Sequence, residues 1–289
     1  MKPLTCDAHI DLLWILSGLA KQTRPTVDAQ RMQFGGLDKM VLALYVADHV
    51  QKRLGEGDTW KEVLLQMQKA KSFFPEHYIA LEGGSALGRD PVRLTSRFRD
   101  LAKAGIKYFT LMHNEDNLFG GSATDVTQMG LTRLGREMVE NCDDEGVMVD
   151  VSHASDRTTD DILAMWTGKP IIASHSGCRA VNSHIRNLLN SQIVRIGMTE
   201  GIVCIPFAQK FVSNIEGVAD HVDHVVQLTG SVLRVGIGSD LDGAVMVEGC
   251  RGAEDWSKVV IDSLSKKGYS DNQIRMIAGG NLLRLLEAK

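Results

Sequence analysis

Short runs of apolar and β-branched residues alternate along this chain with longer segments of helical periodicity. The short runs are apolar almost throughout, which is typical of strands that are buried on both faces of a parallel sheet. We therefore predict eight strands. They span residues 4–8, 39–46, 78–82, 107–112, 147–152, 170–174, 201–206 and 234–239.

The segments between these runs carry apolar residues at helical spacing, as Val63, Met67 and Ala70 do. Caps and glycine stops define several of their ends. The predicted helices span residues 58–74, 94–104, 132–145, 155–166, 218–228, 253–266 and 271–287. Residues 182–195 have an irregular pattern, so a long functional loop is expected there.

The alternation of strands and helices predicts β-α-β units around a parallel sheet. Eight such units favour closure into a barrel over an open doubly wound sheet. The chain has 289 residues and no Pro/Ser-rich linker or low-complexity segment. Barrels of about 250 residues form one domain, so the sequence predicts an α/β protein with a single (β/α)8 TIM barrel over residues 1–289.

Composition and charge narrow the partners and the compartment. The net charge of −4 and the scattered basic residues offer no surface for nucleic acid or an anionic membrane. The first residues lack the apolar run of a signal peptide, and no apolar stretch is long enough to span a bilayer. Five widely spaced cysteines without a CxxC pair indicate a reducing environment. We expect a cytoplasmic protein.

Titratable side chains cluster at the carboxyl ends of the predicted strands, the face on which barrel active sites are built. His9 and Asp11 follow the first strand as an H-x-D pair, whose side chains point to one face of an extended chain. Other strands end at, or are followed by, Glu82, His113, His153, His175 and Asp240. A lone histidine beside an apolar run is usually a core residue, but seven such placements together indicate an active site.

The residue types in this set favour a metal site. Imidazoles and carboxylates without a cysteine cluster suit borderline cations, Zn²⁺ first and Mn²⁺, Co²⁺ or Fe²⁺ as alternatives. Two ions need a bridging group, and a carboxylate can supply it. Glu82 is the best candidate because Gly83 and Gly84 permit a sharp turn beside it, although it could also be a solvated loop acid.

Short motifs extend this pattern over nearly the whole chain. They are D-A-H-I-D at 7–11, L-E-G-G at 81–84, L-M-H-N at 111–114, D-V-S-H at 150–153, A-S-H-S at 173–176 and G-I-G-S-D-L-D-G at 236–243. In this order they resemble the renal (membrane) dipeptidase family, a zinc metallopeptidase branch of the amidohydrolase superfamily. Residues 180–187 resemble its arginine segment, and residues 278–284 its C-terminal helix.

The resemblance implies a two-metal centre of the metal-dependent hydrolase type. His9 and Asp11 would hold one ion, and His153 with His175 would hold the other. Glu82 would bridge the two divalent ions, for which Zn²⁺ is expected. Ala8 and Ile10 stand where the family commonly has Gly and Asn, a departure that removes no ligand.

The resemblance also implies roles in substrate binding and catalysis. His113 would bind the substrate and stabilise charge on the scissile carbonyl oxygen, and Arg186 would clamp a substrate carboxylate. Asp240 would carry the proton, with Asp242 as a structural acid or a rival for that role. The acids at 115–116 either favour a positively charged substrate group or point to solvent.

These roles describe a dipeptidase that hydrolyses small dipeptides, including those with a D-residue on the carboxyl side, by a metal-bridging hydroxide. A homodimer is expected from the relatives. Two alternatives stay open at this point: another amidohydrolase-type activity, such as N-acyl amino acid deacylation or lactone hydrolysis, and a non-catalytic metal-binding relative.

Overall fold

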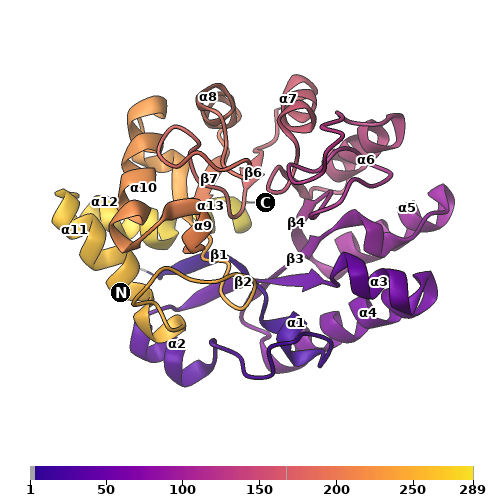
Figure 1. The fold of residues 1–289 in the computed structure, drawn as a ribbon, viewed down its shortest axis with the longest axis horizontal. Helices are drawn as coiled ribbons and strands as arrows, with labels where there is room; N and C mark the ends of the chain where they lie inside the picture. Colours follow the sequence, from indigo (N-terminus) through magenta and orange to yellow (C-terminus); the bar gives the residue numbers. More distant parts are fainter. Residues whose placement is uncertain (1–3, 167, 289) are drawn as a thin grey trace.

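The computed structural model describes residues 4–166 and 168–288 and has eight parallel strands that form a barrel with helices around it (Figure 1). Each strand pairs with the next one in the sequence. The strands are β1 (Cys6–Ile10), β2 (Lys39–Tyr45), β3 (Tyr78–Glu82), β4 (Ile106–Thr110), β5 (Met148–Asp150), β6 (Ile172–Ala173), β7 (Ile202–Ile205) and β8 (Val235–Ile237). The predicted (β/α)8 barrel is confirmed.

The barrel closes just beyond the last residues of β8. The Asp11 amide donates to the Leu241 carbonyl over 2.9 Å, and the Asp240 amide donates to the His9 carbonyl over 3.0 Å. A parallel bridge between Ile10 and Leu241 joins the two strand ends. This closure brings the first and last strands of the chain together at the carboxyl face of the barrel.

Helical segments connect the strands and continue after β8. They are α1 (Leu12–Leu16), α2 (Ala29–Gly35), α3 (Asp48–Leu54), α4 (Glu56–Phe73), η1 (Gly84–Leu87), α5 (Pro91–Ala104), α6 (Arg133–Asp144), α7 (Asp156–Ala164), α8 (Asn190–Met198), α9 (Gln209–Val212), α10 (Ile215–Thr229), η2 (Val232–Arg234), η3 (Ala253–Asp255), η4 (Lys258–Asp262), α11 (Ser263–Lys267), α12 (Asp271–Arg275), η5 (Met276–Gly280) and α13 (Asn281–Leu286).

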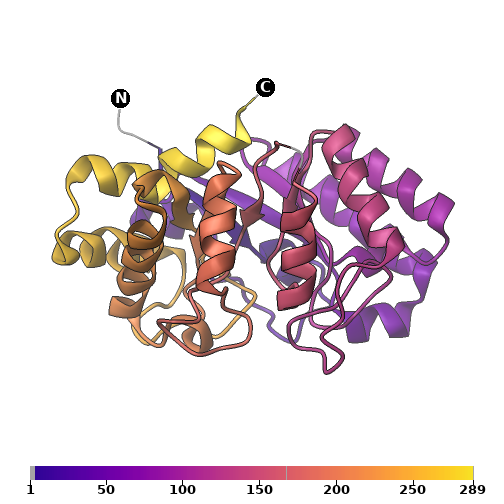
Figure 2. The same cartoon turned by 90° about the horizontal axis from the view of Figure 1, so that it is seen from above.

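The amino-terminal end of the barrel is covered by α13, which lies opposite the long loops that follow the strands (Figure 2). Leu282, Leu285 and Leu286 pack with small and β-branched side chains of the barrel interior, such as Cys6 and Ala8. The apolar packing at this end leaves the carboxyl face for polar side chains. Among helices of the described residues, none has the length and apolar character needed to cross a bilayer.

The structure corrects several predicted elements. The first strand begins at Cys6 rather than residue 4, because Thr5 is bonded to the turn before β2 through Gly36 and Asp38. The strand also continues to Ile10, so His9 lies within β1 instead of after it. Unpredicted helices include α1, α2, α3 and α8, and α8 begins inside the segment that was expected to be a loop.

The predicted C-terminal helices are also interrupted. The stretch 253–266 divides into η3, the π-helical η4 and α11, and 271–287 divides into α12, the π-helical η5 and α13. The single-domain span of 1–289 includes residues 1–3, 167 and 289, which lie outside the described residues, and this assignment stays a prediction.

Candidate metal centre

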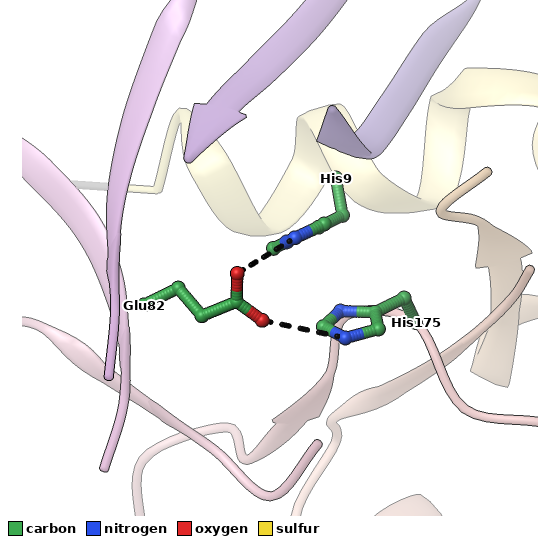
Figure 3. A group of neighbouring side chains, drawn as sticks. All are labelled: His9, Glu82 and His175. Atoms are coloured by element: carbon green, nitrogen blue, oxygen red, sulfur yellow. Dashed lines mark ion pairs between the residues drawn. The ribbon is translucent and has the colours of Figure 1, made fainter. Parts of the chain in front are cut away.

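Glu82 is buried at the carboxyl end of β3, where its carboxylate faces both His9 and His175 (Figure 3). Its Oε2 is 3.4 Å from His9 Nε2, and Asp11 Oδ2 is 3.6 Å from that same nitrogen. Its Oε1 is 3.1 Å from His153 Nε2 and 3.5 Å from His175 Nε2. One carboxylate oxygen thus faces each half of the cluster, which is the arrangement of a bridging ligand.

Two hydroxyl groups set the proton positions on His9 and His175. The Tyr108 hydroxyl donates to the Ala8 carbonyl over 2.6 Å, so it accepts from His9 Nδ1, 3.0 Å away. The hydroxyl of Ser174 donates to Asp150 over 2.5 Å and accepts from His175 Nδ1 over 2.8 Å. In the neutral form of each ring, Nε2 therefore presents a lone pair to Glu82, as a metal ligand must.

Burial and neighbouring charges shift the pKa values of the side chains in the cluster. Burial alone would lower the pKa of His9, but Tyr108 and the Glu82 carboxylate outweigh it and raise that pKa well above its usual range. Burial opposes ionisation of Glu82, yet His9 and His153 hold its pKa well below the ordinary value. Burial lowers the pKa of both His153 and His175, which favours their neutral, metal-binding form.

The polar atoms of the cluster fit divalent cations. Among the described residues, His9 Nε2 and Asp11 Oδ1 are buried without a hydrogen-bond partner. Candidate ligand atoms come within 4.8 Å of one another in three groups. These groups are His9, Glu82 and His175; Glu82, His113 and His153; and His9, Asp11 and Asp240. Nitrogen and oxygen donors of this kind suit Zn²⁺, Mn²⁺ and related ions.

Unusual backbone conformations occur at two residues of the cluster and at Asp242 beside it. His153, Asp240 and Asp242 have φ angles of 69°, 64° and 67°, in the left-handed region that side-chain-bearing residues rarely adopt. Such strain costs about 1–3 kcal/mol per residue and is common at functional sites. Gly243 is required beside them, because a Cβ there would lie 2.0 Å from Asp11 Oδ2.

His113 and Asp240 border the cluster. The rings of His113 and His153 have centroids 4.4 Å apart, and His113 Nδ1 lies 3.1 Å from Asp48 Oδ2 and 3.3 Å from the Tyr45 hydroxyl. Burial and the neighbouring carboxylate of Asp11 raise the pKa of Asp240 well above its usual value. Both side chains are placed where they could contact a substrate held at the centre.

Arg186 brings an almost isolated positive charge into this site. Its side chain is buried, its Nη1 is 3.5 Å from Ser176 Oγ, and its Nη2 has no hydrogen-bond partner among the described residues. The guanidinium also lies 5.4 Å from the centre of the Phe211 ring. Burial lowers the pKa of Arg186 to about 10, which leaves it charged at neutral pH. It is therefore suited to bind an anionic group.

The other acids noted in the sequence have partners outside the cluster. Asp242 Oδ1 accepts from the amide and hydroxyl of Thr26 at 2.7 and 2.8 Å, and so ties down the segment before α2. Glu115 pairs with Lys52 at 2.6 Å, and Asp116 accepts from the Ser122 amide at 2.7 Å. These contacts tie all three side chains to neighbouring segments of the chain.

A cavity of about 550 Å³ lies beside His113. Its wall includes Asp48, which bonds to His113, and Gly84, which lies two residues after Glu82. Asn117 and Phe119 line the same space. None of the candidate metal ligands among the described residues lines this cavity, which is therefore separate from the buried cluster.

Sequence reasoning missed the residues that orient the histidines. They are Asp48, Tyr108, Asp150 and Ser174. Asp150 and Ser174 lie within the histidine motifs, so the sequence offered a signal that they belong to the site. Which histidine each of them orients is decided by how the strands pack. Nothing in the sequence pattern marks Asp48 or Tyr108 as a histidine partner.

The chain is similar to known dipeptidases. Residues 2–289 match the membrane dipeptidase family, peptidase family M19. An uncharacterised dipeptidase of Schizosaccharomyces pombe is 33% identical over 231 residues, which cover 75% of this chain and 55% of that protein. Dipeptidase verJ of Clonostachys rogersoniana is 34% identical over 218 residues, which cover 73% and 54%. The chain thus spans about half the length of these curated relatives.

A solved structure has the same fold. The metallopeptidase of Rhodobacter sphaeroides, liganded with a phosphinate mimic of the dipeptide L-Ala-D-Ala, has a TM-score of 0.82. It is 22% identical, and the similarity covers 98% of both chains.

Proposed function

This chain belongs to the membrane dipeptidase family, and from that premise we propose that it is a metal-dependent dipeptidase acting on small dipeptides. The observation that carries the proposal is the buried Glu82 carboxylate, whose two oxygens face His9 on one side and His153 and His175 on the other. Its curated relatives are named dipeptidases, which supports the same reaction class.

Two divalent ions, which we propose to be Zn²⁺, would be held by this cluster. His9 and Asp11 would hold one ion, His153 and His175 the other, and Glu82 both. When bound, such ions lower the pKa of a water molecule towards neutrality and polarise a carbonyl group. Tyr108 and Ser174 would keep Nε2 of their partner histidines available as ligands.

The remaining groups would bind the substrate and move the proton. Arg186 would bind the terminal carboxylate, because its planar guanidinium is buried and its Nη2 has no hydrogen-bond partner within the described part of the chain. His113 would contact the scissile carbonyl oxygen, with its ring oriented by Asp48. Asp240 would take up a proton on its carboxylate and deliver it to the leaving nitrogen, a role that its raised pKa favours.

We propose that a D-residue is accepted on the carboxyl side. The Rhodobacter sphaeroides metallopeptidase, which has a similar fold, binds a mimic of L-Ala-D-Ala, and this supports the proposed acceptance of a D-residue. We further propose a reducing, cytoplasmic location, because all five cysteines are buried and unpaired.

A substrate panel tests the proposed function. Metal-depleted protein reconstituted with Zn²⁺ is given dipeptides of all chiralities, N-acyl amino acids and lactones. We expect hydrolysis of dipeptides that a chelator abolishes and added metal restores, and no hydrolysis by Glu82→Gln. Turnover of N-acyl amino acids or lactones without dipeptides would favour another amidohydrolase activity. Absence of both metal binding and turnover would indicate a non-catalytic relative.

A further inference from the structure

Arg179 holds the peptide backbone on both sides of Arg186. Its Nε donates to the Asn187 carbonyl over 2.8 Å, and its Nη2 donates to the Ile185 carbonyl over 2.9 Å. The Arg179 amide also donates to the Leu188 carbonyl over 2.9 Å. A single guanidinium thus fixes the residue before Arg186 and the residue after it.

Asp156 fixes the guanidinium of Arg179 in turn. Its Oδ2 accepts from Nη1 over 2.6 Å and its Oδ1 accepts from Nη2 over 2.7 Å, which is a bidentate ion pair. Asp156 is the first residue of α7, three residues after His153, and the Ser155 side chain caps that helix. The ion pair therefore joins the segment that carries a candidate metal ligand to the segment that carries Arg186.

The side chain of Arg186 has little else to set its position. Nη1 approaches Ser176 Oγ to 3.5 Å, at the limit of a hydrogen bond, and the guanidinium lies 5.4 Å from the centre of the Phe211 ring. Nη2 has no hydrogen-bond partner among the described residues. The direction of this guanidinium therefore depends on the backbone at 185–187 as well as on the Phe211 ring. That backbone is what Arg179 holds.

We propose that Arg179 and Asp156 are positioning residues for recognition of the substrate carboxylate. They hold the backbone around Arg186 so that its guanidinium meets the carboxylate at a fixed distance from the metal centre. The inference rests on the proposed function, in which Arg186 binds that carboxylate. A lysine cannot replace Arg179, because one ammonium group cannot donate hydrogen bonds to two carbonyls and to both oxygens of Asp156 at once.

Kinetics on a matched substrate pair test this inference. The substrates are an L,D-dipeptide and its carboxyl-terminal amide, and the variants are Arg179→Lys and Asp156→Asn. We expect KM for the dipeptide to rise about tenfold or more in both variants, with kcat changed less than about threefold. Parameters on the amide, which Arg186 cannot bind as an anion, should change little.

The control is Arg195→Lys. Arg195 also pairs with α7, through Asp160 at 3.0 Å, but among the described residues it has no hydrogen bond to the backbone around Arg186. We expect it to keep the wild-type KM for the dipeptide. In an Arg186→Ala background, Arg179→Lys should add no further rise in KM, because a residue that acts through Arg186 has nothing left to position.

Three results would overturn the inference. Equal losses on the dipeptide and the amide would reduce Arg179 to a general structural role, and so would an additive effect in the Arg186→Ala background. A wild-type KM for the dipeptide in Arg179→Lys would show that Arg179 does not position Arg186. Failure of the proposed function has a different signature, because wild-type protein would then show no dipeptide turnover or no preference for a free carboxylate, and the inference would be overturned with it.

Discussion

At the scale of single residues, the site depends on which atom of each side chain faces the centre. The Nε2 atoms of His9, His153 and His175 all turn towards Glu82. For two of these rings, a hydroxyl with its own acceptor determines which nitrogen carries the proton. Removal of one such hydroxyl oxygen should therefore change the metal affinity measurably.

Tyr108→Phe tests the hydroxyl beside His9. The variant removes the acceptor for His9 Nδ1 and leaves the Ala8 carbonyl without its donor. Loss of such a partner weakens metal binding by about 10–100-fold. Competition with a chromophoric chelator measures the affinity. Tyr45→Phe, which changes a hydroxyl next to His113, is the control and should keep wild-type affinity; equal affinities in all three proteins would contradict the prediction.

Asp240→Asn tests the proton carrier. The amide cannot accept the proton, so kcat should fall by about 10²–10⁴-fold while the metal content stays unchanged. Asp242→Asn is a matched control, since its amide oxygen can still accept from Thr26. Steady-state kinetics with metal analysis gives both values. If Asp242→Asn were inactive and Asp240→Asn active, the proton-carrying role would belong to Asp242 instead.

At the scale of elements, the strands act mainly as anchors for the residues that follow them. β6 has only two residues and β8 three, and their candidate site residues, His175 and Asp240, come two and three positions later. At the opposite end of the barrel, α13 fits closely against β1. Gly279, just before α13, makes this approach possible, because a Cβ there would lie 2.5 Å from the Leu4 carbonyl oxygen.

Gly279→Ala tests this close approach. The added methyl group would meet backbone atoms of Leu4 and Cys6, which cannot move without shifting β1. We expect the free energy of unfolding to fall by about 1–3 kcal/mol, as in other overpacked sites. Gly280→Ala is the control, since its Cβ would first meet the flexible Met276 side chain at 3.2 Å. Urea unfolding that shows equal stability for both variants would refute the argument.

At the scale of the whole molecule, the candidate ligands come from β1 and from the ends of β3, β5 and β6. Cation binding therefore ties distant parts of the sequence to one point. A ligand that binds only the folded state stabilises it by an amount that grows with its concentration. In the described part of the chain, His9 Nε2 and Asp11 Oδ1 are buried without a hydrogen-bond partner, and a cation would supply one for both atoms.

Metal removal should lower the thermal stability of the protein. At a free Zn²⁺ concentration of about 100 times Kd, binding at one site contributes roughly 2.7 kcal/mol, which raises Tm by about 4–5 °C in a chain of this length. Calorimetry with and without a chelator measures the difference. Glu82→Gln should show a much smaller shift, because it lacks the bridging carboxylate. An unchanged wild-type Tm would contradict binding at this centre.

The sequence by itself determined the barrel, the family and the residues to be found at its carboxyl face. This was possible because parallel strands bring their carboxyl ends to one edge, whatever the details of each loop. Boundaries were less predictable: β1 starts later than expected, and α8 occupies part of a supposed loop. Those differences come from bonds such as the one between Thr5 and Asp38, which local periodicity does not contain.

Only the tertiary structure decided how the site residues are oriented. Tyr108 meets Ala8 across 100 positions of sequence, and Arg179 meets Asp156 across 23. The left-handed backbone at His153 and Asp240 likewise exists because surrounding contacts hold it. Motif order tells which side chains reach the same face, but hydrogen bonds between separate strands and loops determine where each nitrogen, oxygen and guanidinium points.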